Sequence, residues 1–187
     1  MWMLERTRVK LAEVTRVDGC DDISVAILTN PDKSGSLNVV IEKARAVQLK
    51  MRLDNEVDTK RYLPEALAVL FSMKNSKDYE VGIWGLTDGE YQATLISKKQ
   101  QDGVRIRLSD AILMSVVADI PIFVDDDLLR QQLSPYTPHP EAVPLPINAI
   151  SVKQLKAELE KALETEDYHL ADQLQKELNK RNEKAKK

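Results

Sequence analysis

Residues 105–124 read RIRLSDAILMSVVADIPIFV, and this stretch sets the order of secondary structure around it. Charged and apolar side chains alternate over its first positions, which is the period-two pattern of a half-buried strand. Ser109 and Asp110 follow, and their side-chain oxygens can cap a helix by accepting from the free N–H groups of its first turn. The next residues are apolar nearly all round, so their helix must be buried, and Pro121 prevents it from continuing. The stretch therefore predicts a strand, a buried helix and, over residues 122–124, a short interior strand.

Earlier in the chain, turn residues separate several shorter patterns. Strands are expected at residues 9–17, 23–28, 37–41, 79–84 and 91–96. The dipeptide Asp88-Gly89 joins the last two as a hairpin. Each half of the chain then has the order strand, strand, strand, helix, which is consistent with an internal duplication. We expect an α+β fold in which a mixed or antiparallel β-sheet carries packed helices.

Two helices are expected between these groups of strands. The first, over residues 42–53, carries four basic residues outside its apolar face: Lys43, Arg45, Lys50 and Arg52. These cations form either a solvated outer face or a local binding surface for phosphate groups. The second helix is expected from Pro64, because proline is tolerated in a first helical turn.

The composition changes at residues 134–146, which contain five of the chain's eight prolines. Such a segment is a stiff linker or, alternatively, a proline-rich ligand for a partner. Beyond it, Ser151 and Gln154 have the spacing of a capping box and two apolar stripes follow, which predicts a helical hairpin. The hairpin alone buries little apolar surface, so we expect it to pair with a second copy, another protein or the domain itself. The expected parts are a domain over residues 1–133, a linker over 134–149 and a hairpin over 150–187.

Composition also limits the function. A net charge of −3 gives no global positive field for nucleic acid or an anionic membrane, so any nucleic-acid contact must be local. Cys20 is the one cysteine, which excludes an internal disulfide, and with His139 and His169 far apart it makes no zinc site. The early charges at the amino terminus and the lack of a long apolar run argue against a secretory signal or a membrane span. We expect a cytoplasmic protein.

Phosphodiester hydrolysis is a chemistry for which the chain has the residue types. It needs an activated water and stabilisation of negative charge, usually through carboxylate-held Mg²⁺ or Mn²⁺ with Arg or Lys assisting. The candidate metal ligands are Asp110, Glu65 and the run of aspartates at 125–127, and the candidate phosphate ligands are Arg61, Arg105 and Arg107. Each has a structural alternative: Asp110 can cap a helix, Arg107 can pair with Asp110, and the aspartate run can stabilise a helix start.

The order Arg107-Leu108-Ser109-Asp110-Ala111-Ile112, followed by Ile120-Pro121-Ile122-Phe123-Val124 and then acids, resembles the closing signature of the bifunctional nuclease family. These are small domains associated with DNase and RNase activity, and their usual Arg-Pro-Ser-Asp-Ala has Leu108 in place of the proline here. The resemblance covers about residues 9–129. With the residue types above, it implies Asp110, Glu65 and Arg107 as catalytic residues, Asp110 and Glu65 as ligands of Mg²⁺ or Mn²⁺, and Lys60, Arg61 and Arg105 as nucleic-acid contacts.

A second family segment, usually Arg-Pro-x-Thr-His-Asp-Leu-Leu, aligns with residues 60–67. Glu65 keeps a carboxylate there, but Leu63 and Pro64 stand where the family has threonine and histidine. If the Thr-His-Asp constellation performs acid–base work in the family, this chain has lost most of it.

The carboxyl-terminal pattern is similar to the UVR motif, a protein-binding helical hairpin of excision-repair and stress-response proteins. Its partner-binding positions correspond to Leu155, Leu159, Tyr168, Ala171, Leu174 and Leu178. Asp172 replaces the usual second small residue, and Gln175-Lys176 replaces the usual Arg-Asp pair.

Two functions follow from these patterns. The first is a metal-dependent nuclease acting on DNA or RNA. The second is a catalytically weakened or inactive oligomeric adaptor whose hairpin recruits a partner protein. A regulatory domain that binds a small molecule has no motif behind it. Exposed edge strands and the hairpin favour a homo-oligomer in either case.

Overall fold

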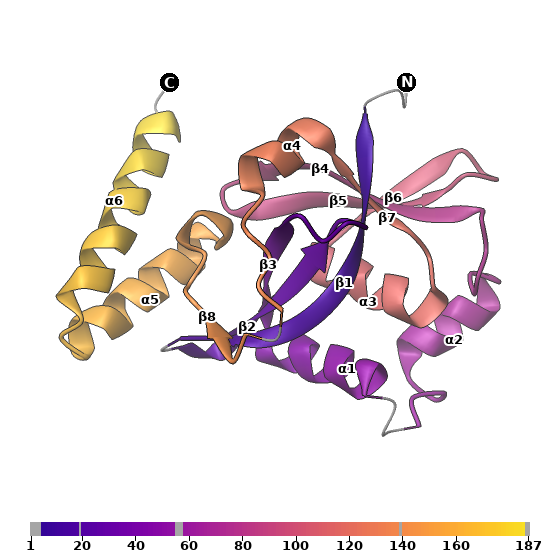
Figure 1. The fold of residues 1–187 in the computed structure, drawn as a ribbon, viewed down its shortest axis with the longest axis horizontal. Coiled ribbons are helices and arrows are strands. Elements are labelled where there is room, and N and C mark those ends of the chain that lie inside the picture. Colours follow the sequence, from indigo (N-terminus) through magenta and orange to yellow (C-terminus); the bar gives the residue numbers. More distant parts are fainter. Residues whose placement is uncertain (1–4, 19, 55–57, 139, 186–187) are drawn as a thin grey trace.

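The computed structural model describes residues 5–18, 20–54, 58–138 and 140–185. Over these residues one mixed β-sheet carries packed helices, and two further helices follow at the carboxyl end (Figure 1). The strand order is β3-β2-β1-β7-β4-β5-β6, and β8 pairs with β1 beside this path. The expected α+β fold is confirmed. Residues 1–4, Gly19 and His139, on which parts of the sequence analysis rest, lie outside the described residues.

Two antiparallel meanders build most of the sheet. The first consists of β1 (Arg6–Val17), β2 (Cys20–Thr29) and β3 (Ser36–Glu42). The second consists of β4 (Tyr79–Thr87), β5 (Glu90–Ser97) and β6 (Asp102–Ile106). A helix follows each meander, α1 (Lys43–Leu53) after the first and α3 (Leu108–Ala118) after the second. The predicted repeat of three strands and a helix is therefore present.

The two meanders are joined through β7 (Ile122–Asp125). It runs antiparallel to residues 6–9 of β1 and parallel to β4. The remainder of β1 pairs with β2 instead, so the two ends of this one strand have different neighbours. β1 is thus the strand that makes a single sheet out of two halves.

The core lies between the sheet and the helices α1, α2 (Leu63–Leu70) and α3, which Figure 1 shows together on one side of it. α3 is the central helix of this layer, and its Ile112 and Leu113 are buried. Its carboxyl end turns at Asp119, whose backbone is left-handed with φ 52°. The prediction of a helix buried on nearly every side and ended before Pro121 is confirmed.

The described residues of the predicted linker, 134–138 and 140–149, lie against the sheet. Ser36 and Ser134 exchange two backbone hydrogen bonds of 2.8 and 2.9 Å. The short strand β8 (Ala142–Val143) then pairs in parallel with the end of β1, and the 3-10 helix η1 (Ile147–Ala149) leads into the hairpin. These contacts hold the start of the hairpin close to the domain.

The hairpin consists of α5 (Val152–Glu164) and α6 (Tyr168–Ala185). The predicted capping box is confirmed, because Ser151 Oγ accepts from the Gln154 N–H at 3.2 Å and Gln154 Oε1 accepts from the Ser151 N–H at 3.0 Å. No helix within the described ranges is both long and apolar enough to cross a membrane.

Polar groups on α5 attach the hairpin to the start of β2. The Cys20 thiol donates to Glu158 Oε2 at 3.1 Å, and Lys161 Nζ lies 3.0 Å from Asp22 and 3.3 Å from Glu158. Burial, with the neighbouring Glu158 carboxylate, raises the pKa of Cys20 to about 12, so its proton stays in place at neutral pH. The hairpin thus contacts the domain itself, one of the docking partners expected for it.

Candidate active site

The amino-terminal end of α3 is built differently from the prediction. β6 ends at Ile106, and Arg107 takes the N-cap position with an extended backbone (φ −62°, ψ 138°) and no side-chain cap. Leu108 turns into the core, so the helix begins there and Ser109 and Asp110 lie inside its first turn. The prediction that these two residues cap the helix is therefore wrong. No side chain caps this first turn, although the Asp110 N–H donates to the Arg107 carbonyl at 3.0 Å. The positive end of the helix can therefore favour an anionic ligand here.

The Asp110 carboxylate sits between two guanidinium groups. Arg45 of α1 forms an ion pair with one of its oxygens, and Arg107 Nε lies 2.9 Å from the other. Arg107 also reaches Glu42 at 3.4 Å. The hydrogen bond and the charge of Asp110 raise the pKa of Arg107, which is therefore fully charged at neutral pH. The Arg107 side chain is 62% exposed although it is held in place, so it can still meet a ligand from solvent.

Glu65 lies in a second, separate arrangement. Arg52 of α1 holds both of its oxygens at 2.8 Å, and the two side chains are only 5% and 11% exposed. Burial on its own would raise the pKa of Glu65, but hydrogen bonds from Arg52 and Thr59 hold that pKa below its ordinary value. Glu65 is thus an ionised carboxylate with a bidentate partner inside the helical layer.

The structure does not bring Asp110 and Glu65 to one place. Their partners Arg45 and Arg52 are seven residues apart on α1, a separation of about 10 Å along the helix axis. Within the described ranges, no group of three or more His, Cys, Asp or Glu side chains could hold a metal ion. A protein-only cage for Mg²⁺ or Mn²⁺ therefore does not fit the donors found here.

The aspartate run at residues 125–127 has a structural role. Asp125 caps the helix α4 (Asp126–Gln132) by accepting from the Leu128 N–H at 3.0 Å. Asp126 accepts from the Thr7 hydroxyl at 2.8 Å, and Asp127 pairs with Arg130 on the next turn. The alternative that these acids stabilise a helix start is the one observed.

The three predicted nucleic-acid contacts are exposed but divided between two places. Arg105 lies on β6, two residues before Arg107. Lys60 and Arg61 lie in the turn before α2, close in sequence to Glu65. The candidate site at the start of α3 therefore keeps Arg105, Arg107 and Asp110.

A shallow cleft of about 170 Å³ borders this site. Its lining comes from β3, the β4–β5 turn, the start of α3 and Gln154 of α5, so the hairpin contributes one wall. The sequence alone did not indicate that Arg45 pairs with Asp110, that Glu42 pairs with Arg107 or that Gln154 lines the cleft. For Arg45 the available signal was its spacing of seven residues from Arg52, which places both on one flank of the helix.

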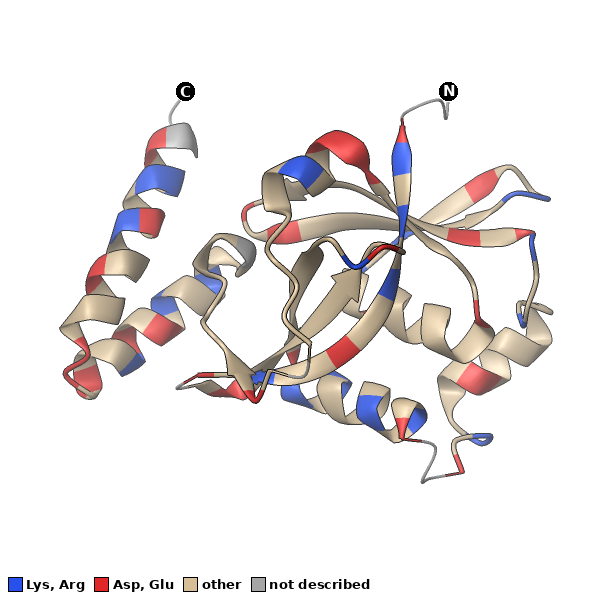
Figure 2. Ribbon diagram, viewed as in Figure 1, with Lys and Arg blue, Asp and Glu red and all other residues tan. Residues whose placement is uncertain are grey.

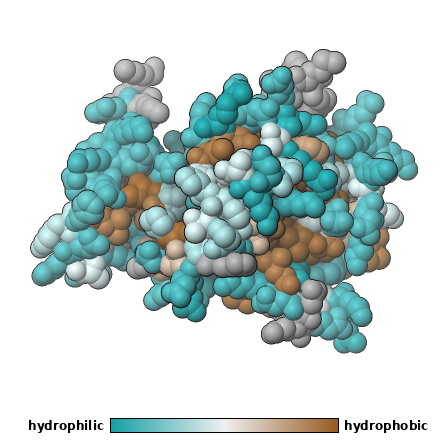
Figure 3. All heavy atoms as spheres, viewed as in Figure 1, coloured by the Kyte–Doolittle hydropathy of each residue, from teal (hydrophilic) through white to brown (hydrophobic). Residues whose placement is uncertain are grey.

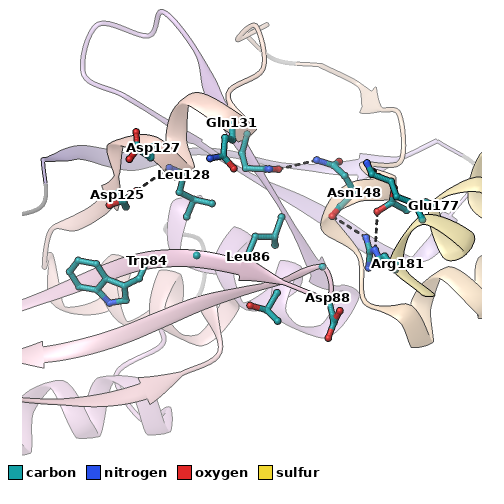
Figure 4. A pocket seen from close by; sticks show the side chains of 15 residues that line it. Trp84, Leu86, Asp88, Asp125, Asp127, Leu128, Gln131, Asn148, Glu177 and Arg181 are labelled. Atoms are coloured by element: carbon teal, nitrogen blue, oxygen red, sulfur yellow. Dashed lines mark hydrogen bonds and ion pairs between the residues drawn. The ribbon is translucent and has the colours of Figure 1, made fainter. Parts of the chain in front are cut away.

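A larger hollow of about 660 Å³ lies between the β4–β5 turn, α4 and α6 (Figure 4). Several of its polar groups already bind other protein groups. Arg181 donates to the carbonyls of Ile150, Asn148 and Ile147 at 2.7–3.2 Å, and Asn148 donates to Gln132 at 2.9 Å. These bonds fasten the hairpin to the domain, and we assign the hollow no chemistry.

The predicted partner-binding residues lie mostly inside the hairpin. Leu155, Ala171, Leu174 and Leu178 are buried in a cluster with Ile150, and Leu159 packs against it. Tyr168, 68% exposed, is the member of the set that faces solvent. A partner that meets the hairpin as it stands here would contact Tyr168 and the polar outer faces of α5 and α6.

Comparison with known protein families identifies a related domain. The model of the bifunctional nuclease domain matches residues 26–137, a range that includes α1, α2, α3 and both candidate carboxylates. The match ends before the hairpin. No curated protein matches the chain.

Proposed function

This chain belongs to the bifunctional nuclease domain family, and from that premise we propose that it hydrolyses phosphodiester bonds of DNA or RNA at the start of α3. The observation that supports this site is the exposed, fixed Arg107. Its guanidinium is oriented by Asp110, which Arg45 holds from the other side, and the uncapped first turn of α3 lies next to it.

The arrangement suits stabilisation of a phosphate in the transition state. Arg107 can give two parallel hydrogen bonds to phosphate oxygens, and the N–H groups of α3 add positive potential at the same end. Asp110 is a positioning residue in this scheme, since its oxygens are already engaged by two arginines. Such preorganised donors typically contribute factors of about 10²–10³ in rate.

Because the donor set does not fit a cage for Mg²⁺ or Mn²⁺, the metal dependence expected from the family stays a prediction. The assay below therefore includes both metals and a chelator.

A second function, the inactive adaptor, is favoured by the start of α2. Glu65 is buried against Arg52, and Leu63, at the position of the family's threonine, is 70% exposed. Val69, Leu70 and Phe71 continue this apolar surface, and Figure 3 shows hydrophobic residues at the surface on the side where α2 lies. An exposed apolar patch of this kind is typical of a protein-binding surface.

One experiment separates the two functions. Hydrolysis of labelled single-stranded DNA and RNA is measured with Mg²⁺, Mn²⁺ or EDTA for the wild type, Arg107→Gln, Asp110→Asn and Arg130→Gln. Arg130 is a matched control, because it also pairs with an aspartate three residues away and is similarly exposed. We expect about a 100-fold loss in Arg107→Gln and none in Arg130→Gln. Equal activity in Arg107→Gln and Arg130→Gln would show that the reaction does not take place at the start of α3. An inactive wild type would favour the adaptor function.

A further inference from the structure

The cations of α1 divide into two pairs on opposite flanks of the helix. Arg45 and Arg52 turn toward α3 and α2, where Asp110 and Glu65 neutralise them. Lys43 and Lys50, also seven residues apart, lie on the other flank and are exposed. Within the described ranges, neither lysine forms an ion pair; the charge of Asp22, which pairs with Lys161, acts on Lys43 from nearby.

These two lysines line a groove of about 270 Å³ between α1 and the first strands of the sheet. Arg16 of β1, also exposed and without an ion pair among the described residues, lies on its opposite wall. Asp21 is the one carboxylate in the lining, so three cations face one acid. Figure 2 shows the basic residues following α1 along the lower edge of the molecule. We call this feature the basic groove, defined by Arg16, Lys43 and Lys50.

We propose that the basic groove holds the phosphate backbone of a single-stranded nucleic acid beside the α3 site. The proposal takes its ligand class from the proposed function. Lys43 and Lys50 are about 10 Å apart along the helix, so their two amines can bind different phosphates of the same strand. Val47, 51% exposed, lies between them and offers bases an apolar contact.

The groove also lies next to the proposed reaction site. Lys43 directly follows Glu42, and Glu42 pairs with Arg107. The amino-terminal end of α1 therefore brings the groove close to the exposed Glu42–Arg107 pair. Because the chain carries a net charge of −3, binding requires such a local concentration of free cations. Three cations are fewer than the about four to eight with which basic clusters recognise anionic lipid, so nucleic acid is the better ligand.

The test is binding of labelled oligothymidylate and oligouridylate in EDTA, followed by fluorescence anisotropy between 50 and 200 mM salt. The test variant is Lys43→Gln/Lys50→Gln. The matched control is Lys153→Gln/Lys156→Gln, which removes the same charge from exposed positions on α5. Losing two phosphate contacts should make the slope of log K against log salt shallower by about 1.4. The control should keep the wild-type slope, and circular dichroism should show that both variants are folded.

Three results would overturn the proposal: no oligonucleotide binding by the wild type at 50 mM salt, equal slopes in wild type and test variant, or an equal loss in the control. Phosphatidylserine vesicles serve as a further probe. Vesicle binding without oligonucleotide binding, lost in Lys43→Gln/Lys50→Gln, would assign the groove to a membrane surface and also overturn it. If the wild type binds oligonucleotides but does not cleave them, the groove proposal stands and the nuclease proposal is refuted. If the wild type cleaves but Lys43→Gln/Lys50→Gln keeps the wild-type salt slope, the nuclease proposal stands and the groove proposal is refuted.

Discussion

Glu65→Gln is the substitution that best separates a structural carboxylate from a catalytic one. In the wild type, Arg52 holds both oxygens of Glu65 at 2.8 Å, and both side chains are nearly buried. Removing one member of a buried ion pair leaves the other charge uncompensated, which lowers the free energy of unfolding by about 3–5 kcal/mol. Glutamine keeps one acceptor for Arg52, so we expect the lower end, about 3 kcal/mol. For a chain of this size that is a fall of about 6–12 °C in Tm.

The double variant Arg52→Met/Glu65→Leu gives the complementary measurement. It removes both charges and fills similar volume with apolar atoms, a change that is often neutral or stabilising. We expect it to recover most of the stability lost in Glu65→Gln. Arg52 also donates to the Gln48 carbonyl at 2.7 Å and lies over the Tyr62 ring, so a small deficit should remain.

Urea unfolding at pH 7, followed by circular dichroism, measures both variants, and equal m-values would show that the unfolding transition is comparable. Nuclease activity is measured on the same preparations at a temperature at which all are folded. The structural assignment predicts reduced stability with activity kept. If Glu65→Gln has wild-type stability and loses cleavage, the reasoning is wrong and Glu65 takes part in the chemistry.

Three further predictions follow from other parts of the molecule. Gly89→Ala should displace the hairpin, because a Cβ at Gly89 would lie 1.8 Å from the Ile150 carbonyl oxygen and the backbone there has φ +80°. The expected result is faster hydrogen exchange in α5 with unchanged exchange in the sheet. Unchanged exchange in α5 would contradict the prediction. Burial alone would raise the pKa values of Glu65 and Glu80, but hydrogen bonds from Arg52 and Thr59 to Glu65, and from Lys98 and Arg6 to Glu80, lower both from the ordinary 4.5. Their contribution to stability is therefore present above pH 4.5 and is lost as the pH falls through the lower folded values. Urea midpoints between pH 7 and 3 should fall accordingly, and a constant midpoint would disagree. Leu70 is 76% exposed, so if the expected homo-oligomer forms through α2, Leu70→Lys should give a smaller species in sedimentation velocity, whereas an unchanged oligomer would exclude this face.

Helices, strands and turns could be predicted because the sequence pattern of each element agrees with the structure that its tertiary contacts require. The apolar residues of α3, the turn at Asp88-Gly89 and the capping box at Ser151 each indicate one structure from a few neighbouring residues. Leu108 shows the limit of such signals. The polar pair after it suggested a cap, but burial of Leu108 starts the helix earlier. Its place as the first helical residue is one that proline favours, so leucine here and the family's proline fit the same position.

The site could be predicted only by residue type, because pairing across the helical layer has no local signal. Asp110 and Glu65 were assigned together to a metal, whereas α1 supplies each with its own arginine. Whether Arg45 and Arg52 face inward and Lys43 and Lys50 outward depends on which flank of α1 meets α3. That flank is fixed by contacts between segments more than fifty residues apart, which periodicity cannot reveal.

The shared strand β1 has a consequence for the order in which the chain is made. Its residues 16–17 pair with β8 and its residues 6–9 pair with β7. β1 therefore leaves the ribosome well before two of its three neighbours, which follow more than a hundred residues later. Contacts so distant in sequence form slowly, since the intervening loop must be closed first. During synthesis, part of β1 therefore presents unpaired N–H and C=O groups, and at this stage the nascent chain is most exposed to wrong pairing with another copy.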